Sequence, residues 1–122
     1  MNRSVNNVAF SGAVLALSAV ILASLGAHLI PMNGLADVWR TASIIHMFNA
    51  AGLLGIAALL ASRESTVLKW GAWLIAMGTL LFSGTIYAHV ISGYQVPGLT
   101  PVGGLIMMVG WAFASMAFLS KS

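Results

Sequence analysis

Residues 8–30 read VAFSGAVLALSAVILASLGAHLI, a run without a single charged side chain. At 1.5 Å per residue, a helix of this length extends about 34 Å, which is enough to cross the roughly 30 Å hydrocarbon core of a bilayer. Three further runs have the same character and span residues 38–61, 67–92 and 101–119. The sequence therefore predicts an all-α fold, a four-helix transmembrane bundle that makes residues 1–122 a single membrane domain.

The composition argues against a soluble protein. Of the 122 residues, 60% are hydrophobic and only 6% are charged, whereas about a quarter of the residues in an ordinary soluble domain are charged. The five lysines and arginines are scattered along the chain, which argues against a nucleic-acid partner. The chain has no cysteine, so disulfides, thiolate metal sites and thiol catalysis are excluded. The partner that the composition predicts is the lipid bilayer.

The basic residues predict an orientation, because short cytoplasmic loops carry an excess of lysine and arginine. With four crossings, four of the five basic residues fall on the same side of the membrane: Arg3, Arg63, Lys69 and Lys121. The opposite side has only Arg40. We therefore expect both termini to lie inside, an N-in/C-in topology.

Small residues recur at helical spacing in each predicted helix, and in a bilayer such faces let helices approach closely. The predicted packing residues are Gly12, Ala16, Ala19, Ala23, Gly26, Gly52, Gly55, Gly71, Gly78, Gly104 and Gly110. Two interpretations stay open. These faces pack the four helices of one chain together, or one or two of them are surplus and form the interface of a homo-oligomer.

Polar groups inside a membrane are costly unless they are partnered, so each is a candidate functional group. The candidate polar or ligand-binding cluster comprises His28, His46, Asn49, Ser83, Tyr87 and His89. All three histidines are expected in the outer half of the bilayer. His46 and Asn49 lie three residues apart and share one face of their helix. We expect this pair to face the bundle interior and to meet Ser83 and Tyr87, or His28.

Three interpretations of the cluster remain open: hydrogen bonding between helices, contact with a lipid headgroup or quinone, and a zinc or copper site made by the three histidines. The histidines come from separate helices without a ligand-spacing motif, so the sequence predicts no metal site and no cofactor. The two acids, Asp37 and Glu64, lie in loops on opposite sides, and no Ser-His-acid set is present, so no catalytic residues are predicted.

These observations predict a non-enzymatic small integral membrane protein. The favoured role is an accessory subunit of a larger membrane complex or a homo-oligomeric component that packs through small-residue faces. The alternative is a binding or transport module for a lipid, a quinone or a small ion, built on the polar cluster.

Several short segments resemble the DUF423 family, the bacterial YgdD-like group whose eukaryotic relatives are called transmembrane protein 256. The segments that carry the resemblance are LFSGTIY (81–87), LTPVGGL (99–105), Gly110-Trp111, Gly26-Ala27-His28 and WRTA (39–42). The family usually has a histidine at the position of Asn49 and more often a glutamine at that of His46, so this chain keeps a polar pair. The resemblance implies four helices and an inner-membrane or organellar location, and it implies no established activity.

Overall fold

The computed structural model describes residues 2–28 and 34–119, and this part of the chain contains four α-helices and no β-strand. The helices are α1 (Arg3–His28), α2 (Ala36–Ser62), α3 (Thr66–Ser92) and α4 (Leu99–Met116). Each is long and apolar enough to cross a membrane. The predicted all-α bundle of four membrane-spanning helices is therefore confirmed.

Several helix ends differ from the predicted boundaries, some beyond the apolar run and some short of it. α1 begins at Arg3 rather than at residue 8, because the Asn2 side-chain oxygen accepts a hydrogen bond from the Val5 amide at 2.9 Å. α4 begins at Leu99 and ends at Met116, not at 101 and 119. The predicted end of the first run, residues 29–30, lies outside the described residues.

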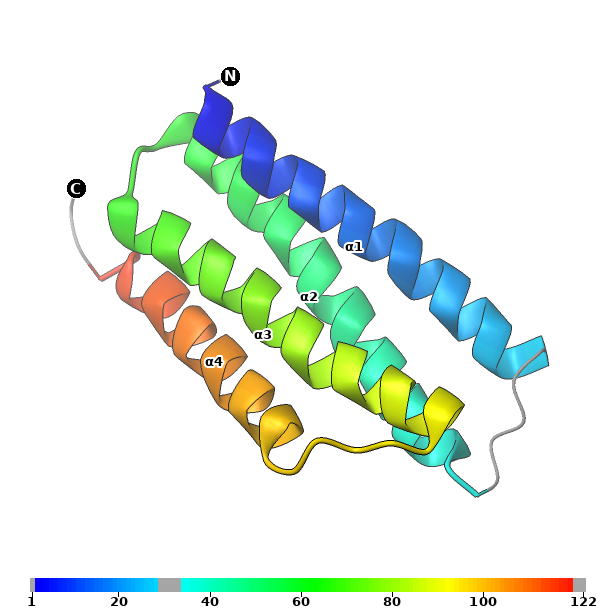
Figure 1. Ribbon diagram of the computed structural model, residues 1–122. Helices are drawn as coiled ribbons and strands as arrows, with labels where there is room; N and C mark the ends of the chain where they lie inside the picture. The colour runs from blue at the N-terminus through cyan, green and yellow to red at the C-terminus, as the bar shows by residue number, and fades with distance from the viewer. Residues whose placement is uncertain (1, 29–33, 120–122) are drawn as a thin grey trace.

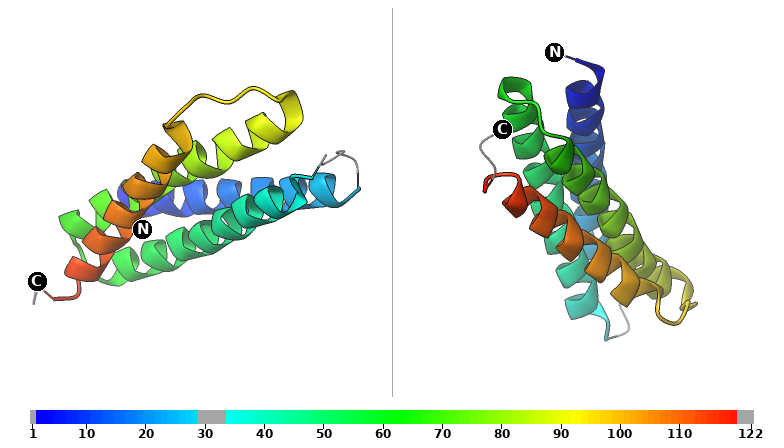
Figure 2. Two further views of the ribbon diagram at one scale, coloured as in Figure 1. Left: turned by 90° about the horizontal axis from the view of Figure 1, so that it is seen from below. Right: turned by 90° about the vertical axis from the view of Figure 1, so that its left-hand side faces the viewer.

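Each helix runs antiparallel to the next one along the chain (Figure 1). α2 and α3 are the central pair, because each contacts both the other and an outer helix. The closest pairs are α1 with α2, α3 with α4, and α2 with α3, whereas α1 and α3 make only a small contact. Both further views show α4 alongside α3 (Figure 2). The fold is thus two hairpins joined through α2 and α3.

Glycines allow the backbones of paired helices to approach closely. A Cβ added to Gly71 would lie 2.8 Å from the Gly110 carbonyl oxygen, so α3 and α4 are in backbone contact there. A Cβ added to Gly12 would meet atoms of α2, including the Ala50 carbonyl oxygen at 3.2 Å. Small residues therefore hold both hairpins together, as the sequence predicts for a bundle.

The two ends of the molecule carry different charges. α1 starts, and α2 turns into α3, at one end of the bundle (Figure 1), which places Arg3, Arg63 and Lys69 together at that end. Arg40 lies near the start of α2 at the other end. Lys121 lies outside the described residues. The N-in/C-in orientation stays a prediction.

Candidate functional site

His46 lies at the centre of a hydrogen-bonded group that joins α1, α2 and α3. Its side chain is buried, with Nδ1 2.9 Å from the Tyr87 hydroxyl and Nε2 3.1 Å from the Ser18 hydroxyl. Ser18 also donates its proton to the Leu15 carbonyl at 3.0 Å. A hydroxyl has one proton, so Ser18 accepts from Nε2–H and Tyr87 donates to Nδ1. Both ring nitrogens of His46 are therefore satisfied within the chain.

Asn49 forms a second group one turn further along α2, and this group reaches α3 and α4. Its Nδ2 donates to the Thr79 hydroxyl at 2.9 Å and to the Met107 sulfur at 3.0 Å. Its Oδ1 accepts from the Trp111 indole N–H at 2.9 Å. Thr79 in turn donates to the Ile75 carbonyl at 2.7 Å. Asn49 is thus one of the polar links between the two hairpins.

The remaining predicted members of the cluster divide between the interior and the surface. Ser83 is buried, but it donates to the Ala42 carbonyl of α2 at 2.9 Å rather than to His46 or Asn49. His28 is exposed at the end of α1, and His89 is only partly buried. The structure therefore brings together His46 and Tyr87, places Asn49 and Ser83 in the same α2–α3 contact, and leaves both other histidines out.

Several members of these groups are absent from the predicted set. Ser18, and not the predicted His28, is the residue of α1 that bonds to His46. The reason is that His28 is the last residue of α1, whereas Ser18 lies near its middle, level with His46. Thr79 stands four residues before Ser83, and helical spacing places the two on one face of α3. Nothing in the sequence of α4 indicates that Trp111 and Met107 reach α2, although Gly110-Trp111 is one of the segments that resemble the family.

The three histidines do not converge. Within residues 2–28 and 34–119, no three His, Asp or Glu side chains lie close enough to hold a metal ion. The exposed acids are paired at the surface instead: Asp37 lies 3.5 Å from Arg40, and Glu64 lies 3.2 Å from Lys69. The arrangement of the described residues favours hydrogen bonding between helices among the three interpretations of the cluster.

The predicted packing residues occupy three environments. Those buried at helix contacts are Gly12, Ala19, Gly71, Gly78, Gly104 and Gly110, and Ala16 packs against the same core from the edge. The indole of Trp39 covers Gly26, and the indole of Trp111 covers Gly52. Gly55 is exposed, and a Cβ there would meet nothing within 4 Å, so it takes no part in packing within the described chain.

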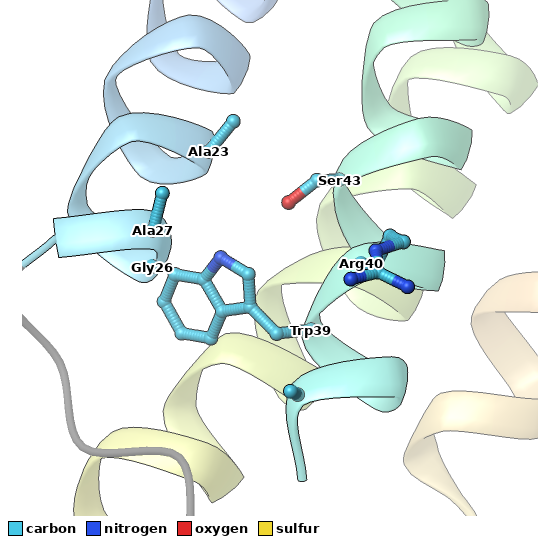
Figure 3. Close-up of a pocket in the computed structure, with 7 residues that line it drawn as sticks. Ala23, Gly26, Ala27, Trp39, Arg40 and Ser43 are labelled. Atoms are coloured by element: carbon cyan, nitrogen blue, oxygen red, sulfur yellow. The ribbon is translucent and has the colours of Figure 1, made fainter.

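Trp39 closes the contact between the end of α1 and the start of α2. Its indole N–H donates to the Leu22 carbonyl at 3.1 Å, and its ring lies 4.7 Å from that of Tyr87 between centroids. Gly26 leaves the space that this indole fills. Next to Trp39 is a pocket of about 200 Å³ between α1 and α2, which Ala23 helps to line (Figure 3).

Comparisons with known proteins agree on one family. The family described as "Protein of unknown function (DUF423)" matches residues 22–104. The UPF0382 membrane protein YwdK of Bacillus subtilis is 35% identical over 113 residues, covering 87% of this chain and 90% of that protein. A UPF0382 membrane protein of Staphylococcus epidermidis is 32% identical over 117 residues, covering 88% and 91%. The UPF0382 inner membrane protein YgdD of Escherichia coli is 33% identical over 97 residues, covering 76% and 74%.

No solved structure matches the chain. The reported matches cover most of this chain and most of each relative, and the relatives' names describe membrane proteins. The family match covers the helices that carry His46, Asn49, Ser83 and Tyr87. The predicted resemblance is confirmed, and the chain is a multi-pass integral membrane protein of the DUF423 family.

Proposed function

We propose that this protein is a non-enzymatic component of the bacterial inner membrane that binds a second membrane protein through the outward face of α2. The second protein is another copy of the chain or a subunit of a larger membrane complex. The inner-membrane location is supported by the name of the Escherichia coli relative. The observation that carries the proposal is a stripe of small residues on α2 that the described chain leaves uncovered.

The α2 stripe consists of Ala51, Gly55 and Ala58, all of which are exposed. Spacings of four and three residues put them on one face of the helix. Small residues are favoured where transmembrane helices approach closely, because lipid provides no hydrophobic drive for association. Among the helical glycines that the structure describes, Gly55 and Gly84 are left uncovered, and only Gly55 has an exposed small residue at helical spacing on each side, so the α2 stripe is the better candidate for a surplus face.

The arrangement of the polar groups supports a non-enzymatic role. The buried imidazole of His46 and the buried amide of Asn49 are committed to partners within the chain. The exposed acids, Asp37 and Glu64, lie at opposite ends of the bundle and each faces a basic side chain. The printed partners of His46 are hydroxyls, and each acid faces a basic side chain, so these residues do not form a carboxylate–imidazole pair for acid–base chemistry.

Disulfide cross-linking in native membranes tests the proposal, because the chain has no cysteine of its own. We expect single cysteines at Ala51, Gly55 and Ala58 to form a dimer, or an adduct with a larger partner. The matched control is Leu105→Cys, which is 60% exposed on α4. Gly55→Leu should weaken the association by blocking close approach. Stripe cysteines that cross-link no better than the control would rule out α2 as the interface.

A second candidate function is binding of a lipid, a quinone or a small ion. It is favoured by the groove between α1 and α3, where cavities of about 200 Å³ and 320 Å³ share Leu15 and Leu80. His46 and Tyr87 line the smaller cavity. The double variant His46→Leu, Asn49→Leu should then stay folded but lose a co-purifying molecule in native mass spectrometry. An identical spectrum from the wild type and the double variant would exclude this candidate.

A further inference from the structure

The pocket between the end of α1 and the start of α2 has one small wall and one polar wall. Ala23, Gly26 and Ala27 form the α1 side, and Trp39, Arg40 and Ser43 form most of the α2 side. Figure 3 shows the Ser43 hydroxyl and the Trp39 indole turned toward α1, with Arg40 beside them on α2. The pocket has a volume of about 200 Å³.

The Ser43 hydroxyl is a buried polar group without a hydrogen-bond partner in the described chain. Its residue is only 6% exposed, and no described atom lies in hydrogen-bond geometry with Oγ. The Tyr87 hydroxyl interacts with Ser43 at longer range and donates its proton to His46 Nδ1, but its oxygen does not lie in hydrogen-bond geometry with Ser43 Oγ. A hydroxyl withdrawn from water is costly when it is left unpaired. A ligand oxygen in the pocket would supply the missing partner.

Two groups at the rim of the pocket favour an anion, the first turn of α2 and Arg40. Ala36, in the first turn of α2, lines the pocket, and the N-cap residue Leu35 makes no side-chain cap hydrogen bond. Uncapped amide groups at a helix N-terminus carry partial positive charge and bind phosphate and carboxylate groups. Arg40 adds a full positive charge, and its 3.5 Å contact with Asp37 is surface-exposed and weak. No acidic side chain lines the pocket among the residues that the structure describes.

We propose that this pocket binds the phosphate group of a phosphate ester, in the first instance the headgroup of an anionic glycerophospholipid. The phosphate lies against Arg40 and the first turn of α2, and an oxygen of the glycerol or its ester meets Ser43. Arg40 and Ser43 are three residues apart, so a helix sets them about 4.5 Å apart along its axis. A free phosphate ester offers the same anion without the acyl chains that anchor a lipid.

The position of the pocket favours the lipid. It lies at the end of two membrane-spanning helices, next to a tryptophan, which is the level where headgroups meet the hydrocarbon core. This inference does not depend on the α2 stripe, because Ala51, Gly55 and Ala58 begin two turns beyond Ser43 and do not line the pocket.

Lipid titration of the purified, delipidated protein in detergent tests the site by native mass spectrometry and thermal shift. The probes are phosphatidylglycerol, diacylglycerol, which lacks the phosphate, and glycerol 3-phosphate, which lacks the chains. We expect saturable binding of phosphatidylglycerol and none of diacylglycerol. Arg40→Gln should weaken binding at least about tenfold, the loss expected for a hydrogen bond to a charged group, and Ser43→Ala should weaken it about fivefold, the loss expected between uncharged groups. Lys69→Gln, at the opposite end of the bundle, is the matched control and should bind as the wild type does.

The variants also separate a ligand site from a packing defect. Without lipid, Ser43→Ala should melt no lower than the wild type, because it removes an unpaired buried hydroxyl. With phosphatidylglycerol, the wild type should gain more thermal stability than Ser43→Ala. Glycerol 3-phosphate that binds as tightly as the lipid would assign the site to a free phosphate ester. Binding of phosphatidylglycerol that is unchanged in both Arg40→Gln and Ser43→Ala would overturn the proposal.

Discussion

At the scale of single residues, the buried amide of Asn49 shows how a polar side chain is accommodated in lipid surroundings. It is 2% exposed, and each end of the amide has a partner on another helix. The apolar bundle offers no water to replace these partners, so the side chain and its neighbours must be positioned together. His46 follows the same rule with hydroxyl partners on α1 and α3.

We predict that Asn49→Leu destabilises the bundle by about 1 kcal/mol, because the Trp111 indole N–H loses its acceptor inside the membrane. The measurement is unfolding by sodium dodecyl sulfate in detergent micelles, followed by circular dichroism. Trp111→Phe should cost less in the Asn49→Leu background than in the wild type, since the two side chains share one interaction. The control is Ser62→Ala, at an exposed hydroxyl. Additive losses from the two changes would contradict the predicted coupling.

At the scale of helices, the sequence predicted the spans well and the choice of partners poorly. Long uncharged runs locate membrane helices because only a fully hydrogen-bonded helix is stable in hydrocarbon. Gly52 and Gly55 show that such runs do not indicate which face of a helix meets a neighbouring helix. Both lie in the same apolar helix three residues apart, yet Trp111 of α4 covers Gly52 and nothing in the described chain covers Gly55. A helix that is apolar all round carries no periodic signal for the face that meets a neighbour.

For the candidate site as well, the sequence predicted which residues are buried but not which of them pair with one another. Buried polar residues in an apolar run had to face the interior, and His46, Asn49, Ser83 and Tyr87 do so. The individual pairs depend on how far each helix slides along its neighbour, which the sequence does not encode locally. Ser18 rather than His28 meets His46 for this reason.

The α3–α4 contact provides a direct test at this scale. A Cβ on Gly78 would lie 2.5 Å from the Met107 amide nitrogen and 2.7 Å from the Gly103 carbonyl oxygen, which are backbone atoms of α4. We therefore predict that Gly78→Ala costs about 2 kcal/mol, as overpacking does in a close helix contact. Gly84→Ala, in the same helix, meets nothing within 4 Å and should be neutral or stabilising by up to about 1 kcal/mol. Equal melting temperatures for the two variants in detergent would show that α4 does not pack as described.

At the scale of the whole molecule, the two ends of the bundle differ in charge and in how they are closed. At the α2–α3 end, Arg63 donates to the Ala117 carbonyl at 3.1 Å and lies 5.4 Å from the Phe118 ring centroid, so it links α2 to the end of α4. Lys69 and Glu64 lie at the same end. The α3–α4 loop at the other end, residues 93–98, has no charged residue. A bundle with this asymmetry has a preferred direction of insertion.

We predict that the end with Arg3, Arg63 and Lys69 faces the cytoplasm, because short loops rich in lysine and arginine are retained on that side. Single cysteines can report this without removal of native ones, since the chain has none. Glu64 and Tyr94 are suitable positions, because the Glu64 side chain is 76% exposed and Tyr94 is 72% exposed, at opposite ends of α3. In intact cells a membrane-impermeant maleimide should label Tyr94→Cys and leave Glu64→Cys unmodified until the membrane is permeabilised. Labelling of Glu64→Cys alone would reverse the orientation, and equal labelling of both in sealed cells would contradict a single topology.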